Sequence, residues 1–279
     1  MTLYVSDLDG TLLNSKQELS ITTVNIINDL IGNGLRFSIA TARSFDSAGR
    51  IIEPLQLQLP IILHNGVFIF DPIEKVNILS NYLECEILSG VLKVFKEMEI
   101  SPIIFTRNEN QESKVYYKGI FNAGEEHYIK DRLAKKDKRF ILTDDFSVCM
   151  SQDVITILAI SKNETLEPAY EIIRNTFDLT CHYTVDIYSK ANWLELTHKN
   201  ANKRDSVRYL KKLLGFEKLV CFGDNLNDCS MFEIADEKYA VRNAHEILKN
   251  TATGIIGCNN EDGVAKFLKS VYKGISTAQ

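Results

Sequence analysis

The sequence contains few of the features that mark metal knuckles, redox centres, secreted proteins or membrane proteins. Its six cysteines include no Cys-x-x-Cys pair, which argues against a zinc knuckle or a dithiol redox site. We expect reduced, buried thiols, as in a cytosolic protein. No run of about 18 apolar residues occurs, and the first residues lack the basic and apolar segments of a signal peptide. We therefore expect neither membrane insertion nor secretion.

Basic charge is also scarce, because 37 acidic residues outnumber 32 basic ones and the formal net charge is -5. This balance argues against nucleic acid as the main partner, but it allows a local site for a small anion. The basic run at 135–139 is interpreted as a solvated loop. Glycine-rich loops of the two common nucleotide-binding patterns are missing, so the sequence does not support a nucleotide-cradling loop.

The most informative stretch is the apolar segment at 3–5 with the polar residues that follow it. This segment is typical of a strand that is buried on both faces. Asp7 and Asp9 stand at its end, before Gly10, which permits a tight turn. Ligands of open α/β sheets bind outside the carboxyl ends of the strands. Both carboxylates therefore lie where a site is expected.

Two adjacent carboxylates repel each other, so a cation should lie between them and a substrate. Mg²⁺ is the natural candidate, because it prefers hard oxygen ligands and keeps waters that a phosphate displaces. A calcium loop with Asp7, Asp9 and Glu18 as ligands is excluded by Leu12, which stands where such loops require glycine. A turn with two solvated acids is the simpler alternative for this stretch alone.

The next segments predict a parallel α/β arrangement. Ser20 caps a helix at 21–31, and an apolar strand follows that helix. Strand, helix and strand form a right-handed parallel unit, which brings Thr41 and Arg43 to the same sheet edge as Asp7. A hydroxyl and a guanidinium there suit phosphate oxygens, although Thr41 is equally well explained as a helix cap.

The middle of the chain predicts a separate α/β unit without a recognisable catalytic motif. An apolar strand at 60–63 and a hairpin at 67–78 precede it, and a strand at 193–197 should re-enter the first architecture. Within this unit we predict helices near 86–98, 122–133 and 164–177 and strands near 101–106, 115–117, 154–160 and 179–185. We therefore predict a core domain at 1–83 and 187–279, with an inserted α/β domain at 84–186.

Two further segments place charged groups at the ends of strands or the starts of helices. Asn202 caps a helix that begins with Lys203, where a cation gains nothing from the helix dipole unless an anion is its partner. The apolar strand at 218–223 ends in glycine and acids, which place Asp224 and Asp228 one helical turn apart. This repeats the pattern of the first stretch.

These motifs resemble the four ordered motifs of the haloacid dehalogenase superfamily of phosphohydrolases. The residues that carry the resemblance are Asp7-Leu-Asp-Gly-Thr11, Thr41, Lys203 and Gly223-Asp-Asn-Leu-Asn-Asp228. The long insert resembles the α/β cap of the Cof-type branch, as do Asn65-Gly66, Asn243-Ala244 and Glu261-Asp262-Gly263-Val264. The resemblance implies a Rossmann-like parallel-sheet core with an inserted α/β cap domain that selects the substrate.

The same resemblance implies a cytoplasmic, Mg²⁺-dependent phosphatase of small phosphorylated metabolites. Asp7 would be the nucleophile that forms an aspartyl-phosphate, and Asp9 would be the general acid and base. The residues implied in metal binding are Asp7, Asp9 through its backbone carbonyl, Asp224 and, indirectly, Asp228, which would act through waters or orient Lys203. The residues implied in substrate binding are Thr41, Lys203 and Asn227 on the phosphoryl oxygens, with Arg43 assisting.

The sequence departs from the family pattern at three positions, Ala42, Arg204 and Arg242, where glycine is common. Each adds a side chain close to where backbone or substrate should approach, which puts the shape of the substrate in question. The inserted domain offers four side chains that either face the site or pack in its own core, namely Phe105, Arg107, Tyr117 and Tyr183.

Two alternative functions stay open at this stage. One is a phosphomutase or a phosphotransferase that uses an acceptor other than water, and the other is a non-catalytic sensor of a phosphorylated ligand. The substrate also stays open, since sugar phosphates, pyridoxal phosphate and flavin mononucleotide are all compatible with the resemblance. The oligomeric state is open as well.

Overall fold

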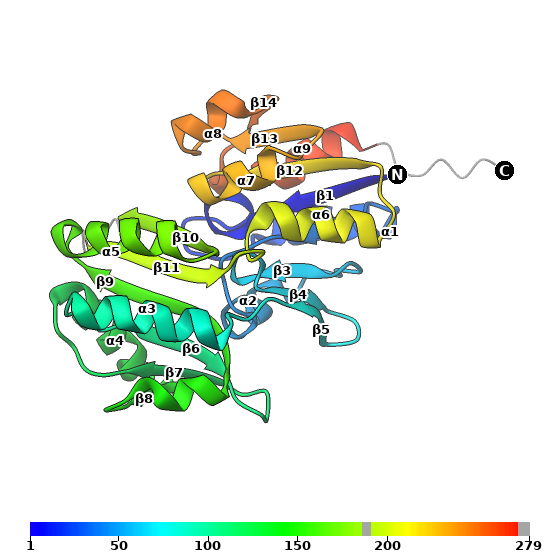
Figure 1. Ribbon diagram of the computed structural model, residues 1–279. Coiled ribbons are helices and arrows are strands. Elements are labelled where there is room, and N and C mark those ends of the chain that lie inside the picture. The colour runs from blue at the N-terminus through cyan, green and yellow to red at the C-terminus, as the bar shows by residue number, and fades with distance from the viewer. Residues whose placement is uncertain (186–190, 273–279) are drawn as a thin grey trace. The chain divides into compact units, whose positions relative to one another are not determined.

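The computed structural model describes residues 1–185 and 191–272, which form two compact units (Figure 1). We call the first the core unit; its described residues are 1–80 and 201–272. We call the second the inserted unit; its described residues are 81–185 and 191–200. Every helix in the described part of the chain is too short or too polar to cross a membrane.

A parallel sheet forms the centre of the core unit. Its strand order is β14-β13-β12-β1-β2, and each neighbouring pair is parallel. The strands are β1 (Thr2–Ser6), β2 (Phe37–Ile39), β12 (Lys218–Gly223), β13 (Glu237–Val241) and β14 (Gly254–Ile256). β1 lies between two parallel partners, and its residues Leu3 and Val5 are fully buried. Tyr4, which points to the other face, is only partly buried, so the predicted strand is confirmed, and its burial at 3–5 is complete on one face.

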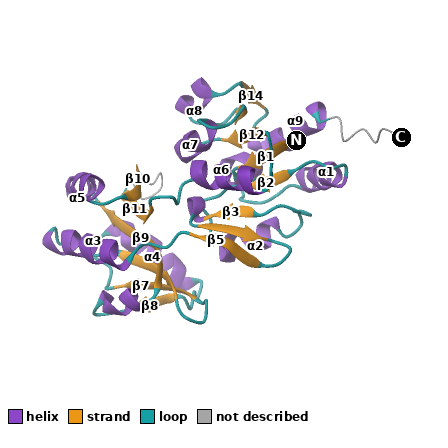
Figure 2. Ribbon diagram, turned by 45° about the vertical axis from the view of Figure 1, so that its right-hand side comes forward, coloured by secondary structure: helices purple, strands orange, loops and turns teal. Residues whose placement is uncertain are grey.

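Helices cover this sheet, and a small antiparallel sheet extends it (Figure 2). The helices are α1 (Ile21–Gly32), α2 (Phe45–Ile52), α6 (Lys203–Leu213), α7 (Cys229–Phe232), α8 (Glu246–Thr251) and α9 (Gly263–Val271). The antiparallel sheet consists of β3 (Ile61–Leu63), β4 (Phe68–Asp71) and β5 (Val76–Ser80). Ala40, which follows β2, pairs in parallel with Ile62 of β3. The predicted strand near 60–63 and the hairpin after it are therefore confirmed.

Side-chain caps set the starts of α1 and α6. Ser20 Oγ accepts a hydrogen bond from Thr23 N at 2.9 Å, and Asn202 Oδ1 accepts one from Asp205 N at 2.8 Å. These bonds satisfy backbone donors that the first helical turn leaves unpaired. Both caps were expected, and the second makes Lys203 the first residue of its helix.

The inserted unit contains a mixed sheet with helices on both faces. Its strand order is β10-β11-β9-β6-β7-β8. The strands are β6 (Ile103–Arg107), β7 (Ser113–Tyr117), β8 (Phe140–Leu142), β9 (Asp153–Ser161), β10 (Leu179–Val185) and β11 (Asn192–His198). The helices are α3 (Cys85–Glu97), α4 (Ala123–Ala134) and α5 (Asn163–Thr176). Residues of α3 and α5 pack with one face of the sheet, and Ile129 of α4 packs with the other.

The strand expected at 193–197 belongs to a different sheet from the one predicted. β11 pairs antiparallel with β9 and with β10, so the prediction that this strand re-enters the core sheet is wrong. The physical reason is the short connection from Val185 to Asn192, which suits an antiparallel neighbour, whereas a parallel return needs a longer crossover. β8 was not predicted, because it is only three residues long and partly exposed. The predicted boundary between 186 and 187 lies outside the described residues.

The expectation of buried thiols holds for part of the cysteines. All six are free, and Cys149 and Cys221 are fully buried. For Cys85 the expectation is wrong, because the first position of α3 leaves its side chain exposed. The pKa values of Cys149 and Cys221 are raised by burial, to about 12 for Cys149, so these thiols stay protonated and unreactive.

Candidate active site

The candidate site lies at the carboxyl edge of the core sheet, as the strand-end motifs predicted. β1 is in parallel register with both neighbours, so that Ser6 pairs with Ile39 and with Phe222. The residues directly after these three strands therefore emerge together at one edge. Asp7 follows β1, Thr41 follows β2, and Asp224 follows β12.

A buried lysine links two of the acidic residues. Lys203 Nζ donates hydrogen bonds to Asp7 Oδ1 and to Asp228 Oδ1, each at 2.6 Å. The exposed fractions of these side chains are 1% for Lys203, 8% for Asp7 and zero for Asp228. The sequence indicated that a lysine at the start of α6 needs an anionic partner. The structure provides two such partners, the carboxylates of Asp7 and Asp228, which come from two other loops.

The electrostatics of this cluster follow from burial and from charge. Burial raises the pKa of Asp7 well above its ordinary value, and repulsion from Asp228 and Asp224 adds to the rise, while Lys203 lowers it. Burial alone would lower the pKa of Lys203, but its contacts with Asp228 and Asp7 outweigh burial and raise it. Burial, together with repulsion from Asp228, raises the pKa of Asp224 to about 6. These rises reflect that three ionised carboxylates would carry more negative charge than Lys203 can neutralise, so without a further cation the cluster favours protonation of a carboxyl group.

The loop after β1 is shaped to bring Asp224 close. Gly10 has a φ of 74°, a left-handed conformation that favours glycine. A Cβ at Gly10 would lie 2.3 Å from Asp224 Oδ2, so any other residue would push this carboxylate away. The neighbouring Thr11 donates from its hydroxyl to Asp224 Oδ1 at 2.9 Å. Gly10 and Thr11 thus form a cradle for the Asp224 carboxylate.

The acidic cluster fits a divalent cation such as Mg²⁺. Asp7, Asp224 and Asp228 each offer a carboxylate oxygen within 4.8 Å of the others. Three carboxylates and one ammonium leave two negative charges, which a divalent cation balances, and oxygen donors are the ligands that Mg²⁺ prefers. Both oxygens of Asp228 are already hydrogen-bonded, Oδ1 to Lys203 and Oδ2 to the backbone N–H groups of Asp224 and Asn225. Asp7 and Asp224 are therefore the residues that would hold the ion directly.

Asp9 points to a different partner from the other acids. Arg43 donates to its two carboxylate oxygens at 2.7 Å and 2.6 Å, and also to Gln17 Oε1 at 2.9 Å. The hydrogen bonds with Asp9 raise the pKa of the Arg43 guanidinium. The structure thus places Arg43, which was predicted to bind substrate, in a two-point contact with Asp9. The Asp9 side chain is 45% exposed, so it remains open to solvent.

Thr41 and Asn227 join the same edge through Asn65. Thr41 is fully buried, its Oγ1 accepts from Arg43 N at 3.1 Å, and its carbonyl accepts from Asn65 N at 2.9 Å. Asn227 Nδ2 donates to Asn65 Oδ1 at 3.2 Å. The φ of 52° at Asn65 fits a tight turn, which an Asn-Gly pair favours. The Asn65 side chain also reaches the site residue Asn227.

The three departures from the family pattern show where the added side chains go. Arg204 forms ion pairs with Asp205 and Glu233, and it is 41% exposed. Arg242 forms an ion pair with Glu261 and is 65% exposed. Ala42 is exposed as well. Both arginines therefore pair with surface acids other than those of the acidic cluster.

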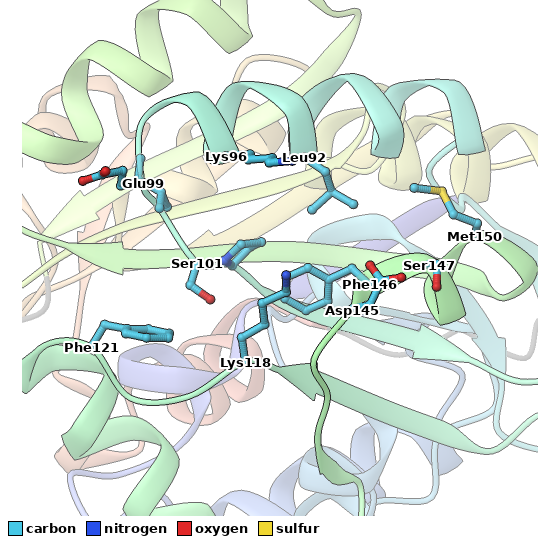
Figure 3. A pocket seen from close by; sticks show the side chains of 12 residues that line it. Leu92, Lys96, Glu99, Ser101, Lys118, Phe121, Asp145, Phe146, Ser147 and Met150 are labelled. Carbon is cyan, nitrogen blue, oxygen red and sulfur yellow. The ribbon is translucent and has the colours of Figure 1, made fainter.

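The inserted unit has a pocket of its own, of about 500 Å³ (Figure 3). Lys118 and Phe121 line one side of it and Leu92 of α3 lines another, and the Lys118 ammonium lies 5.1 Å from the centre of the Phe146 ring. This pocket shares no residue with the acidic cluster. The packing alternative applies to the three aromatic residues named from the sequence, because Tyr117 and Phe105 pack in one core cluster and Tyr183 stacks on Tyr170.

Comparison of the sequence with known proteins identifies relatives that are named as hydrolases and phosphatases. The sequence profile of the haloacid dehalogenase-like hydrolases matches residues 4–268. Phosphatase YwpJ of Bacillus subtilis is 28% identical, over 96% of this chain and 99% of that protein. The 5-amino-6-(5-phospho-D-ribitylamino)uracil phosphatase YitU of the same organism is 25% identical, with 97% of each chain covered.

A solved structure agrees as well. The structure of a haloacid dehalogenase-like hydrolase from B. subtilis has a TM-score of 0.77 and 25% identity, and the match covers 98% of this chain and 100% of that one. The match spans both units and includes every strand end described above. The chain therefore belongs to the haloacid dehalogenase-like hydrolases, in their Cof-type phosphatase branch, and is a phosphoric monoester hydrolase.

Proposed function

We propose that this chain is a cytoplasmic, Mg²⁺-dependent phosphatase that hydrolyses small phosphorylated metabolites through a phosphorylated Asp7. The observation that carries the proposal is the buried contact of Lys203 with Asp7, next to the Asp224 carboxylate. A carboxylate held beside an ammonium and two further acids is suited to a site that receives a cation together with an anionic phosphate.

In the first step, an oxygen of Asp7 attacks phosphorus while the bond from phosphorus to the alcohol oxygen breaks. Asp9, when protonated, gives its proton to the leaving alcohol. Thr41, Lys203 and Asn227 hold the phosphoryl oxygens. Asp7, the Asp9 backbone carbonyl and Asp224 would hold Mg²⁺, which would supply further charge stabilisation.

In the second step, water attacks the phosphorus of the phosphorylated Asp7. Asp9 takes a proton from that water, the bond between the Asp7 oxygen and phosphorus breaks, and phosphate leaves. The two-point contact with Arg43 orients the Asp9 carboxylate and favours the ionised form that takes the proton from water in this step. Arg43 is thus proposed to act through Asp9 as well as on the substrate.

Several groups of the site must contribute to catalysis, because the uncatalysed reaction is very slow. Hydrolysis of phosphate monoesters requires acceleration of up to ~10²¹-fold, which corresponds to roughly 28 kcal/mol. No single contact supplies this amount. The nucleophile, the proton transfer, the metal and the cationic clamp of Lys203 must therefore act together.

Phosphate release from a panel of phosphorylated metabolites tests the proposal. Wild-type protein is assayed with Mg²⁺ and with excess chelator, beside Asp7→Asn and the control Asp29→Asn, which changes an exposed carboxylate on α1. We expect Mg²⁺-dependent release from one or a few compounds, a loss of at least ~1,000-fold in Asp7→Asn, and no change in the control.

Three results would overturn the proposal. An isomerised phosphosugar with little free phosphate would establish a mutase, and binding of a phosphorylated compound without turnover would establish a sensor. Undiminished turnover by Asp7→Asn would refute the role of Asp7.

A further inference from the structure

Two segments near the C-terminal end of the core unit hold the backbone of the loop after β1. Asn243 Nδ2 donates to the carbonyl of Gly10 at 2.7 Å, and Asn259 Nδ2 donates to the carbonyl of Leu13 at 2.9 Å. The side chain of Asn260 accepts from the backbone N–H of Ser15 at 2.9 Å. Three asparagine side chains thus bind three successive points of one loop, from more than 200 residues away in the sequence.

From these contacts we infer that Asn243, Asn259 and Asn260 are positioning residues for the reaction, and that Asn243 has the largest role. They hold the loop that carries Asp7 and Asp9 without touching the reacting atoms. The inference rests on the proposed function, since it concerns the loop from which Asp7 and Asp9 act.

The amide of Asn243 is fixed at both ends although its side chain is exposed. Its Nδ2 donates to Gly10, and its Oδ1 accepts from the backbone N–H of Asn259 at 3.0 Å. Only one orientation of the amide satisfies both bonds, because one end must donate and the other must accept. An exposed amide with no such task would exchange its hydrogen bonds with water. The double contact therefore connects the loop to the segment at 258–263.

The point that Asn243 holds is mechanically sensitive. Gly10 stands between Asp9 and Thr11, and its left-handed backbone leaves no room for a Cβ beside Asp224. A rotation of the peptide after Gly10 would move Thr11, whose hydroxyl donates to Asp224. Holding the Gly10 carbonyl therefore fixes the position of Asp9 on one side and of Thr11 on the other.

The same segment also holds the second acidic loop. The backbone N–H of His245 donates to the carbonyl of Asp224 at 2.7 Å. Residues 243 and 245 therefore touch both of the loops that build the acidic cluster, one through a side chain and one through the backbone. This makes the segment after β13 a shared support for Gly10 and Asp224, which must keep a close contact. Misplacing a reacting group by about 1 Å can cost about 100-fold in rate.

The experiment compares Asn243→Asp with Asn250→Asp in the full chain. Asn243→Asp keeps size and the acceptor oxygen but removes the donor to Gly10 and places a carboxylate beside its carbonyl oxygen. Asn250→Asp makes the same charge change on α8, at an exposed residue that makes no hydrogen bond to the loop among those found in the described residues. Steady-state kinetics with Mg²⁺ and hydrogen exchange of the peptide covering residues 8–13 are measured for both, with thermal unfolding as a check on folding.

We expect kcat to fall about tenfold or more in Asn243→Asp, with KM and the unfolding midpoint close to those of wild type. Hydrogen exchange of residues 8–13, measured in the absence of substrate and metal, should be faster in Asn243→Asp than in wild type. Asn250→Asp should match wild type. Asn260→Ala, which releases the loop only at Ser15, should lower kcat less than Asn243→Asp does.

Unchanged kcat and exchange in Asn243→Asp would overturn the inference. A fall in the unfolding midpoint with unchanged kcat of the folded protein would also overturn it, because it would show a purely structural role. Inactive wild-type protein would instead refute the proposed function, and the exchange measurement would still test the support of the loop.

Discussion

Substituting Lys203 with methionine tests how much its positive charge stabilises the acidic cluster of Asp7, Asp224 and Asp228. Lys203→Met keeps the length and much of the apolar volume of the side chain, but removes the ammonium that lies 2.6 Å from both Asp7 and Asp228. All three side chains are at least nine-tenths buried, so the two carboxylates would lose their cation without gaining solvent. Removing one partner of such a buried pair typically costs about 3–5 kcal/mol. At about 2–4 °C per kcal/mol, the unfolding midpoint should fall by roughly 10 °C.

Thermal unfolding of the metal-free protein in chelator measures this effect, and a matched control is available on the same helix. Lys211 pairs with Asp236 at 3.3 Å and is 25% exposed, so Lys211→Met should cost less than about 1 kcal/mol. Adding Asp228→Asn to Lys203→Met should restore part of the loss, because it removes one of the two unbalanced carboxylates. A change below about 1 kcal/mol in Lys203→Met would refute the view that the ammonium offsets buried negative charge.

Three further perturbations follow from the same geometry. Gly10→Ala forces a Cβ to within 2.3 Å of Asp224 at a φ of 74°, so it should lower the free energy of unfolding by ~1–3 kcal/mol and weaken Mg²⁺ binding. Gly32→Ala, where the Cβ meets open space, should change the free energy of unfolding by less than ~1 kcal/mol. Equal effects of the two substitutions in calorimetry would contradict this prediction. Arg43→Lys keeps the charge but loses the two-point contact with Asp9, so kcat should fall about tenfold. The unfolding midpoint should hardly change, because Asp9 is 45% exposed. An unchanged kcat in steady-state kinetics would contradict this prediction. In chelator, burial raises the pKa of Asp224 from 3.8 to about 6, so folding favours its protonated form. The resulting stabilisation is fully present below pH 3.8 and is lost as the pH rises through 6. Unfolding midpoints of wild type and Asp224→Asn should therefore change differently with pH between these values, and parallel curves would count against the prediction.

Contacts that depend on neighbouring residues were predictable from the sequence. The caps at Ser20 and Asn202, the buried strand at β1 and the acidic strand ends all follow from short patterns with a clear physical cause. The convergence of Asp7 and Asp224 follows from the rule that parallel strands present their carboxyl ends at one edge.

Contacts between distant segments were not predictable in this way. The pairing of Arg43 with Asp9 depends on the path of two loops, and nothing in the residue types separates it from a contact with substrate. The support of Gly10 by Asn243 joins positions 233 residues apart, and a single asparagine in a loop has many possible partners. β11 was assigned to the wrong sheet because its alternating pattern does not identify the strands it pairs with, and the short connection after β10, which favours an antiparallel neighbour, was not weighed.

The most direct test of the account is the covalent state of Asp7 in the Asp9→Asn protein. With p-nitrophenyl phosphate and Mg²⁺, the first step needs little acid catalysis because nitrophenolate is a good leaving group, whereas the second step lacks its base. We predict a burst of about one nitrophenolate per chain, followed by a stall, and a phosphoryl group on the peptide that contains Asp7 by mass spectrometry. Steady release with unmodified protein, or a phosphoryl group on another residue, would contradict the assignment of Asp7 as the nucleophile.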